Sequence, residues 1–340
     1  SGCMKKFVRV LLILAACLAC LGVVLTAVGG FWSARVYNRL IPEEAVSISF
    51  PLNADTLSSL TLNVGVGEVR FAEAPSPEAA RMDTEGFSEG DFIFSENKQG
   101  EVVLRSRSML GGESIFNLGF LRMDWLGRLH TGTLARRIVT VYLPAGQLDR
   151  LRIEGGTGDI GGTLPVSARE LSISCGTGNV KLSGLRADDI SIEAGMGNIT
   201  LDQLICKKLT VSGGTGGLTL RDGEASESAV FELGTGTTQL HRVALHKLDL
   251  SAGVGSLSLS GTLRGDCEIE LGVGSSDIHL LEPSTHYSAE IERGLGNLSV
   301  SGANVLRLDD ETEAISPDGN ADCQLKIQMG MGSLALSFDP

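Results

Sequence analysis

Six residues beginning at Gly156 could bind a phosphate, because they read Gly-Thr-Gly-Asp-Ile-Gly and match the dinucleotide-binding pattern G-x-G-x-x-G. In such a site the glycines let the backbone approach a pyrophosphate, which lies at the N-terminus of the following helix. Here no crossover helix is predicted after the glycines. Nine other G-x-G triads occur in the chain without the third glycine. We therefore interpret the triads as structural elements and predict no cofactor and no cofactor-binding residue.

The same segment resembles the start of a glycine-aspartate calcium repeat. In that repeat the aspartate follows the glycine by two places and the period is nine residues. Here Ile160 fills that place. The residue directly after each triad is Asp159 in this case, and Glu, Asn, Gly, Thr or Ser in the others. Such a mixture is typical of polar corners, so we predict no metal ligand.

Other reactive side chains are scattered. His241 and His246 lie five residues apart without a third ligand nearby, and the acidic run at residues 309–313 is typical of a solvated loop. The motifs H-E-x-x-H, G-x-S-x-G and G-x-x-x-x-G-K-[ST] do not occur. We predict no catalytic residue and no enzyme activity. The last four of the seven cysteines are too dispersed for a disulfide framework and are expected to be small apolar fillers: Cys175, Cys206, Cys267 and Cys323.

The charge balance excludes one class of partner. The 340 residues carry 41 acidic and 28 basic side chains, which gives a net charge of −13. A chain of this charge repels phosphate backbones and has no basic patch to release their counterions, so we predict no nucleic-acid binding.

The N-terminal segment predicts a membrane anchor. Residues 10–28 are uncharged and apolar, and 19 residues of helix span about 28 Å, close to the thickness of the hydrocarbon core. Lys5, Lys6 and Arg9 precede this segment, which favours a cytoplasmic N-terminus at residues 1–9. Residues 29–44 would form a juxtamembrane linker. We expect a single-pass protein of the cell membrane, with the remaining domain, residues 45–340, outside the cytoplasm.

Two other interpretations of this segment stay open. Leu14 to Cys17 resembles a lipobox, which would make the chain a lipoprotein through Cys17, although apolar residues continue beyond it. In the second interpretation the apolar segment is a secretory signal peptide and is cleaved from the mature protein. Met4 resembles a natural start, so residues 1–3 need not be native.

A repeat organises the rest of the chain. From Gly156 to Gly272 the triads recur at steps of 19 or 20 residues. We expect each triad to form a corner in which glycine adopts a positive φ, with Gly195 and Gly234 as examples. The glycines of the ten predicted corners are Gly65, Gly67, Gly156, Gly158, Gly176, Gly178, Gly195, Gly197, Gly214, Gly216, Gly234, Gly236, Gly253, Gly255, Gly272, Gly274, Gly294, Gly296, Gly330 and Gly332.

Apolar residues keep fixed offsets from the first glycine of each triad. They fill 44 of the 50 places at offsets −5, −3, −1, +4 and +6, which is the alternation of half-buried strands. One strand pair cannot bury such a row alone, whereas stacked pairs form a continuous core. We therefore predict an all-β fold, a β-solenoid of about ten rungs of 19 or 20 residues, preceded by the transmembrane helix.

Longer spacings mark loops. The largest insertion lies at about residues 73–150, and within it Phe116, Phe120, Met123 and Trp125 concentrate large apolar side chains. These four residues are our candidates for either a cap on the solenoid or a contact with a partner or membrane surface. Between Gly272 and Gly294 the step is 22 residues, and Ser275 and Ser276 are interpreted as two extra corner residues.

The strand from Ile138 to Pro144, the step into residues 148–153, and the serial corners with Asp or Asn resemble the bacterial adhesin-like β-strand-repeat family, also called toastrack, a domain of unknown function. The resemblance implies that the solenoid is a single-stranded right-handed β-helix, often beside a membrane segment, with surface or envelope-stress roles and no catalytic residues. The aromatic insertion and the Asn, Ser or Thr at many corners depart from the family pattern.

These observations together favour a non-enzymatic, membrane-anchored extracytoplasmic solenoid that binds or scaffolds components of the cell envelope. Its expected partners are the cytoplasmic membrane, through residues 10–28, and envelope or membrane proteins, while self-association stays open. The alternative is an accessory or sensor subunit in envelope-stress signalling.

Overall fold

The computed structural model describes residues 46–87, 90–107, 136–164, 166–309, 311–315 and 321–340. Over these ranges the regular elements are 20 strands of one sheet and two short 3-10 helices, η1 (Pro77–Ala79) and η3 (Ser284–His286). The all-β prediction is confirmed for this part of the chain. None of its helices is long and apolar enough to cross a membrane. The predicted span at residues 10–28 lies outside the described residues.

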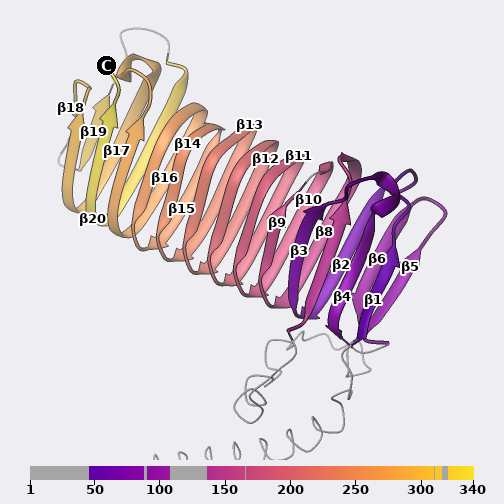
Figure 1. Ribbon diagram of the computed structural model, residues 1–340. Helices are drawn as coiled ribbons and strands as arrows, with labels where there is room; N and C mark the ends of the chain where they lie inside the picture. The colour runs from indigo at the N-terminus through magenta and orange to yellow at the C-terminus, as the bar shows by residue number, and fades with distance from the viewer. Residues whose placement is uncertain (1–45, 88–89, 108–135, 165, 310, 316–320) are drawn as a thin grey trace, which may run out of the picture. The chain divides into compact units, whose positions relative to one another are not determined.

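The middle of the chain is a stack of parallel strands (Figure 1). Equivalent residues are aligned, so that Ile173 lies beside Ile153 on one side and Ile192 on the other. This register gives backbone groups partners in both neighbouring rungs. The strands are β8 (Gly146–Thr157), β9 (Ile160–Thr163), β10 (Val166–Thr177), β11 (Val180–Met196), β12 (Ile199–Thr215), β13 (Leu218–Thr235), β14 (Thr238–His246), β15 (Leu248–Val254) and β16 (Leu257–Leu280).

The core of the stack consists of the apolar residues that alternate along each rung. Around the triad at Gly176, the side chains of Leu171, Ile173, Val180 and Leu182 are at most 2% exposed. Polar residues occupy the places between them. The predicted β-solenoid is therefore the observed architecture, with its apolar columns directed inward.

The second glycine of each triad has a positive φ, between 132° and 153° in all ten. Gly197 has a φ of 132°, and a Cβ built there would lie 2.6 Å from the carbonyl carbon of Gly178 in the neighbouring rung. Side chains are therefore excluded at this corner for two reasons, the backbone conformation and the close stacking.

The first glycine of the triad is needed for a different reason from the one we expected. Neither Gly195 nor Gly234 has a positive φ, so the prediction of that conformation is wrong for these two residues. A Cβ on Gly195 would instead lie 2.6 Å from the carbonyl oxygen of Gly176. The stacked backbones approach too closely at this point for any side chain.

Polar side chains directly after the triads link neighbouring corners. The backbone N–H of Asn179 donates to Asp159 Oδ1 at 2.7 Å, that of Asn198 to Asn179 Oδ1 at 3.0 Å, and that of Gly217 to Asn198 Oδ1 at 2.8 Å. These are the places that we compared with a calcium repeat. In the structure they serve as hydrogen-bond acceptors for the next rung.

We expect Asn198→Ala to lower the free energy of unfolding by about 1 kcal/mol, because it removes the side-chain acceptor of the Gly217 N–H at a solvent-exposed corner. Asn198→Asp keeps an acceptor oxygen and should retain most of the stability. Denaturant unfolding of both variants checks this. Equal losses for the two would contradict the assigned role of the side-chain oxygen.

At the N-terminal end, strands from the predicted insertion extend and cover the stack. Residues within 73–150 supply β6, which pairs in parallel with β2, and β7, which pairs in parallel with β3. Antiparallel strands then cover this rung, since β5 pairs with β6, β4 with β7, and β1 with β4. The bounds are β1 (Val46–Pro51), β2 (Ser59–Val66), β3 (Glu68–Glu73), β4 (Arg81–Phe87), β5 (Phe92–Glu96), β6 (Glu101–Ser106) and β7 (Ile138–Leu143).

Aromatic side chains close this end of the core. The rings of Phe50 and Phe94 are stacked with their centroids 5.2 Å apart, and those of Phe87 and Phe92 meet edge to face at 4.7 Å. The antiparallel strands β1, β4 and β5 thus form a cap with its own apolar packing.

The C-terminal end departs from chain order. The last strand, β20 (Cys323–Phe338), lies between β16 and β17 (Tyr287–Ser301) and pairs in parallel with both. The triad at Gly330 therefore stacks between those at Gly272 and Gly294. The short strands β18 (Leu306–Arg307) and β19 (Thr312–Ile315) form a hairpin that pairs antiparallel with the start of β17.

The interpretation of Ser275 and Ser276 as extra corner residues is wrong. Both pair in register with β20, opposite Ser333 and Leu334, without a bulge. Ser276 occupies an inward place and is 9% exposed. The longer spacing is instead taken up after β16, where η3 precedes β17.

Candidate functional site

The middle residue of each triad points away from the core and forms a column along the corner. At the C-terminal end, four consecutive members of this column are apolar and 43% to 74% exposed. We call them the corner ridge: in stacking order, Val254, Val273, Met331 and Leu295. Exposed apolar residues in contiguous rows are typical of interaction surfaces.

Strand insertion assembles this ridge. Val273 is paired with Val254 and with Met331, and Met331 is paired with Leu295. Met331 comes from β20, 58 residues after Val273 (331 − 273), and completes the row only because β20 enters between β16 and β17. In the preceding rungs the column is mostly polar, with Thr157, Thr177, Thr215 and Thr235.

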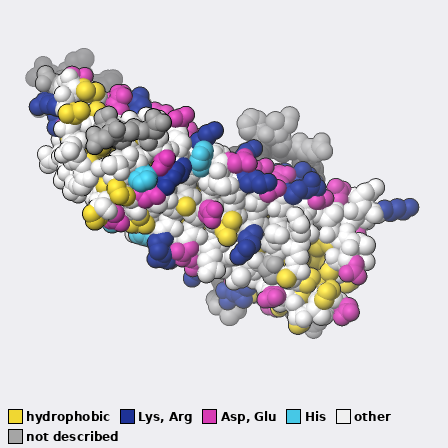
Figure 2. Space-filling model, turned by 90° about the horizontal axis from the view of Figure 1, so that it is seen from above, with side chains coloured by type: hydrophobic (Ala, Val, Ile, Leu, Met, Phe, Trp, Pro, Cys, Tyr) yellow, Lys and Arg dark blue, Asp and Glu magenta, His cyan; other side chains and the backbone are white. Residues whose placement is uncertain are grey.

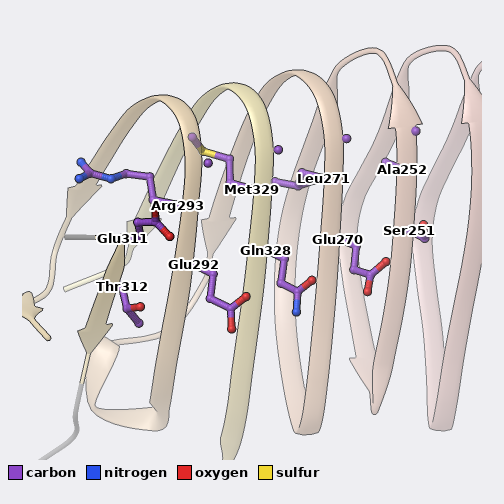
Figure 3. Close-up of a pocket in the computed structure, with 14 residues that line it drawn as sticks. Ser251, Ala252, Glu270, Leu271, Glu292, Arg293, Glu311, Thr312, Gln328 and Met329 are labelled. Atoms are coloured by element: carbon purple, nitrogen blue, oxygen red, sulfur yellow. The ribbon is translucent and has the colours of Figure 1, made fainter. Parts of the chain in front are cut away.

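A groove of about 580 Å³ runs beside the corner ridge (Figure 3). Its wall is a row of polar side chains from successive rungs, which Figure 3 shows pointing the same way: Ser251, Glu270, Gln328 and Glu292. Glycines of the corresponding triads line the side next to the ridge. Ligands reaching this groove would therefore meet backbone on one side and carboxylates on the other.

The hairpin of β18 and β19 closes one end of the groove. The backbone N–H of Arg293 donates to the carbonyl oxygen of Glu311 at 2.7 Å, and the Arg293 guanidinium lies 3.6 Å from the Glu313 carboxylate. Thr312 also lines this end. The groove is thus built from the rungs of β15, β16 and β17, the inserted β20, and the hairpin.

The carboxylates of the groove wall are separated by uncharged residues. In stacking order the column reads Glu232, Ser251, Glu270, Gln328, Glu292. Two rungs separate each carboxylate from the next, which is about 9.6 Å at a strand spacing of about 4.8 Å. This alternation limits like-charge repulsion within the stack. The Glu292 carboxylate is in addition paired with Lys326, whose Nζ lies 3.3 Å away.

The acidic run at residues 309–313 has a structural role in the hairpin. The carboxylate of Asp309 accepts hydrogen bonds from the N–H groups of Glu311 and Thr312, at 2.8 and 2.7 Å, and from the Thr312 hydroxyl at 3.1 Å. These hydrogen bonds lower the pKa of Asp309. The carboxylate therefore fixes a turn.

The candidate ligand side chains are not gathered into a metal site in the described part of the chain, where no group of three His, Cys, Asp or Glu residues has suitable geometry. His246 Nδ1 lies 3.1 Å from the carbonyl oxygen of Glu227 in the adjoining rung. His286 Nδ1 lies 2.5 Å from Asp322 Oδ2. The hydrogen bond from His286 lowers the pKa of that carboxyl.

The four described cysteines are buried and unbridged. Burial raises the pKa of Cys175 to about 11 and that of Cys206 to about 12, so both thiols stay protonated at neutral pH. The Cys323 thiol hydrogen-bonds to Cys267, which raises the pKa of Cys323 and lowers that of Cys267. These positions agree with the expected use of cysteine as a small apolar filler.

The aromatic candidates for a cap or contact, Phe116, Phe120, Met123 and Trp125, lie outside the described residues. The glycines chosen from the sequence lie at the corners, next to the ridge. The ridge itself is absent from our predictions, although the sequence contains a signal for it. The middle residue of the triad is Val, Val, Leu or Met in the last four triads, where Thr is more common earlier.

Exposed apolar side chains are most frequent near the C-terminal end. Figure 2 shows hydrophobic side chains at that end of the molecule, on the left, and a second group at the opposite end. Besides the corner ridge, this end exposes Leu306 in β18 and Leu308 just after it, which are 57% and 62% exposed. The C-terminal end is therefore the part of the solenoid best suited to contact another molecule.

The sequence pattern of a protein family described as Toastrack DUF4097 matches residues 116–335, a span that includes nine of the ten triads. No curated protein matches the chain. Among solved structures, the chain is similar to a candidate cell adhesion protein of Clostridium sporogenes, with 13% identity, a TM-score of 0.23, and coverage of 87% of this chain and 100% of that one. It is also similar to a candidate adhesin of Bacteroides fragilis, with 11% identity, a TM-score of 0.34, and coverage of 87% and 98%.

Proposed function

Because the chain belongs to the Toastrack DUF4097 family, we propose that it is a non-enzymatic binding module of the cell envelope whose contact surface is the corner ridge. The observation that carries this proposal is the row of four exposed apolar side chains on adjacent rungs. In the earlier rungs the column is mostly threonine, and Met196 stands there between two threonines, so a run of four apolar members occurs in the described residues at this end of the solenoid. Burial of such a row against a partner is favourable by about 25 cal/mol for each Å² removed from water.

The neighbouring groove supports binding as well. The Glu270 carboxylate beside the ridge favours a partner that presents a basic side chain, whereas the Glu292 carboxylate is already paired with Lys326 Nζ at 3.3 Å. Apolar contact on the ridge would supply affinity, and the carboxylates would orient the partner and exclude acidic ones.

We further propose that residues 10–28 anchor the chain in the cytoplasmic membrane, with the solenoid on the extracytoplasmic side. The support is the length of the apolar segment and the basic residues Lys5, Lys6 and Arg9 before it. In this arrangement the corner ridge is available to proteins of the envelope.

The triple variant Val254→Thr, Val273→Thr, Met331→Thr tests the ridge. Threonine is the residue that this column has in other rungs, so we expect the fold to persist and the melting temperature to change by no more than about 2 °C. Capture of envelope partners by a membrane-impermeant crosslinker on intact, wall-stripped cells should fall by about tenfold or more, since buried apolar anchors carry most of the binding energy.

Met196→Thr is the matched control for this experiment. Met196 belongs to the same column and is 54% exposed, but its neighbours in the column are Thr177 and Thr215. It should leave capture unchanged. If the triple variant captures the same partners as the unmodified protein, the ridge is not the contact surface. Absence of any labelling of the unmodified solenoid would contradict its extracytoplasmic location.

A further inference from the structure

The two halves of the terminal rung are covered unequally. Strand β17 forms this rung, and its first half pairs with β19 at residues 289–292. Ile291 of β17 and Ile315 of β19 are buried there, at 0% and 3% exposure. The second half of β17, Asn297–Ser301, pairs with β20 on one side, and no described residue pairs with its other side.

The core is incomplete at this second half. Leu298 and Val300 are aligned with Leu334 and Leu336 of β20 and occupy the same inward columns. Leu334 and Leu336 are each 1% exposed, whereas Leu298 and Val300 are only partly buried. The next strand that would complete the burial of these two side chains is missing from the described chain.

Protective features that usually block pairing at a free strand edge are lacking in this segment. Its sequence is Asn-Leu-Ser-Val-Ser, without lysine, proline or any charge. The opposite end of the solenoid differs, because its outer strand β1 ends at Pro51 and β5 ends at Glu96. The edge of residues 297–301 is therefore open to pairing with a further strand.

The polarity of the segment is symmetric about Ser299. Polar residues occupy its first, third and fifth places, and Leu298 and Val300 occupy the second and fourth. In an antiparallel pair centred on Ser299, Leu298 of one strand would face Val300 of the other, and Asn297 would face Ser301. A contact with two-fold symmetry requires such a self-complementary edge. If one residue of the first copy faces a second residue in the other copy, the same two residues also face each other with the copies exchanged.

We propose that residues 297–301 pair antiparallel with the same residues of a second copy of this chain, to give an end-to-end dimer with its two-fold axis at Ser299. The pairing satisfies the open backbone edge and buries Leu298 and Val300 on both sides. Leu295, which lies two residues before the paired segment and is also exposed, would lie next to the contact. No charged side chain of the paired segments would face a like charge.

Cysteine crosslinking of the full-length chain in membranes tests this dimer. Residues that face each other in an antiparallel pair have Cβ atoms about 5 Å apart, so Ser299→Cys should form an intermolecular disulfide when a mild thiol oxidant is added. Ala335→Cys is the matched control, because Ala335 is aligned with Ser299 one rung further in and is also exposed, but both sides of its strand are paired. We expect at least tenfold more dimer from Ser299→Cys.

Adding Val300→Lys to Ser299→Cys should lower the yield of disulfide dimer by about tenfold, since a charge is brought to the contact from each copy. Thermal melting of the double variant establishes that the fold is retained. If Val300→Lys lowers the melting temperature substantially, the crosslinking is repeated with Asn297→Lys, a substitution at an exposed position of the same edge.

Several results would overturn the dimer. These are a dimer yield from Ser299→Cys no higher than that from Ala335→Cys, a yield unaffected by lysine at the edge, or a crosslink from the cysteine of the Ser299→Cys variant to a different protein. The ridge variant Val254→Thr, Val273→Thr, Met331→Thr should leave the disulfide dimer unchanged. Self-association and partner binding can thus fail independently.

Discussion

Gly197→Val is expected to lower the free energy of unfolding by about 4 kcal/mol. The backbone φ of 132° at this corner is one that a β-branched residue does not adopt, which costs about 1–3 kcal/mol. The new Cβ would also overlap the carbonyl of Gly178 in the neighbouring rung, and relief of such overlap costs about 1–3 kcal/mol more. Denaturant unfolding and the yield of folded protein measure the effect.

Two further variants separate these causes. Gly197→Ala keeps the overlap at Cβ but lacks the branched side chain, so its loss should be smaller than that of valine and still exceed about 2 kcal/mol. Met196→Val changes the preceding residue, whose side chain is 54% exposed, and should be within about 0.5 kcal/mol of the unmodified protein. A neutral Gly197→Val would mean that the corners are not tightly stacked.

The rungs themselves could be predicted from the sequence because their signal is repeated ten times. The fixed offsets of apolar residues from each triad determine which side chains point inward, and the pairing of Ile173 with Ile153 and Ile192 follows from the constant step. The requirement for glycine at each triad could also be predicted. The different reasons for the first and the second glycine could not, because the close backbone stacking at Gly195 is a contact between rungs.

The order of the last rungs could not be predicted in the same way. Each triad presents the same apolar columns, so β20 fits between β16 and β17 as well as it would fit after β17. In the structure β20 lies before β17 in stacking order, and the long connection after β17 forms a hairpin that covers the first half of the terminal rung. This insertion assembles the corner ridge, since it brings Met331 between Val273 and Leu295. Knowledge of the middle residues alone does not reveal their adjacency.

The N-terminal cap was only partly accessible to sequence reasoning. Within residues 73–150 the sequence predicts the strand from Ile138 to Pro144, but the pairing partners of such a strand depend on long-range contacts. Antiparallel β4 alternates buried and less buried residues as the parallel rungs do, so periodicity does not distinguish the two directions. The stacked pair Phe50 and Phe94, from strands 44 residues apart (94 − 50), likewise has no local signal.

Phe231→Ala is expected to destabilise the middle of the solenoid by about 3–5 kcal/mol. Phe231 lies in β13, is fully buried, and is among the largest buried side chains of the described residues. Its neighbours in the same column are Val211 and Leu250, both fully buried as well. Removal of the ring leaves a cavity that these short side chains cannot fill, so the loss includes both transfer and cavity contributions.

Phe231→Leu provides the control, because leucine is the residue of the next rung in this column and should cost no more than about 1.5 kcal/mol. Stability in a solenoid depends on contacts between neighbouring rungs, so the defect should be local. Hydrogen exchange of Phe231→Ala should lose protection in β12, β13 and β15 first, while β2 and β8 near the N-terminal cap keep theirs. Uniform loss of protection over all rungs would mean that the stack unfolds as one cooperative unit and that its rungs are not independently stabilised.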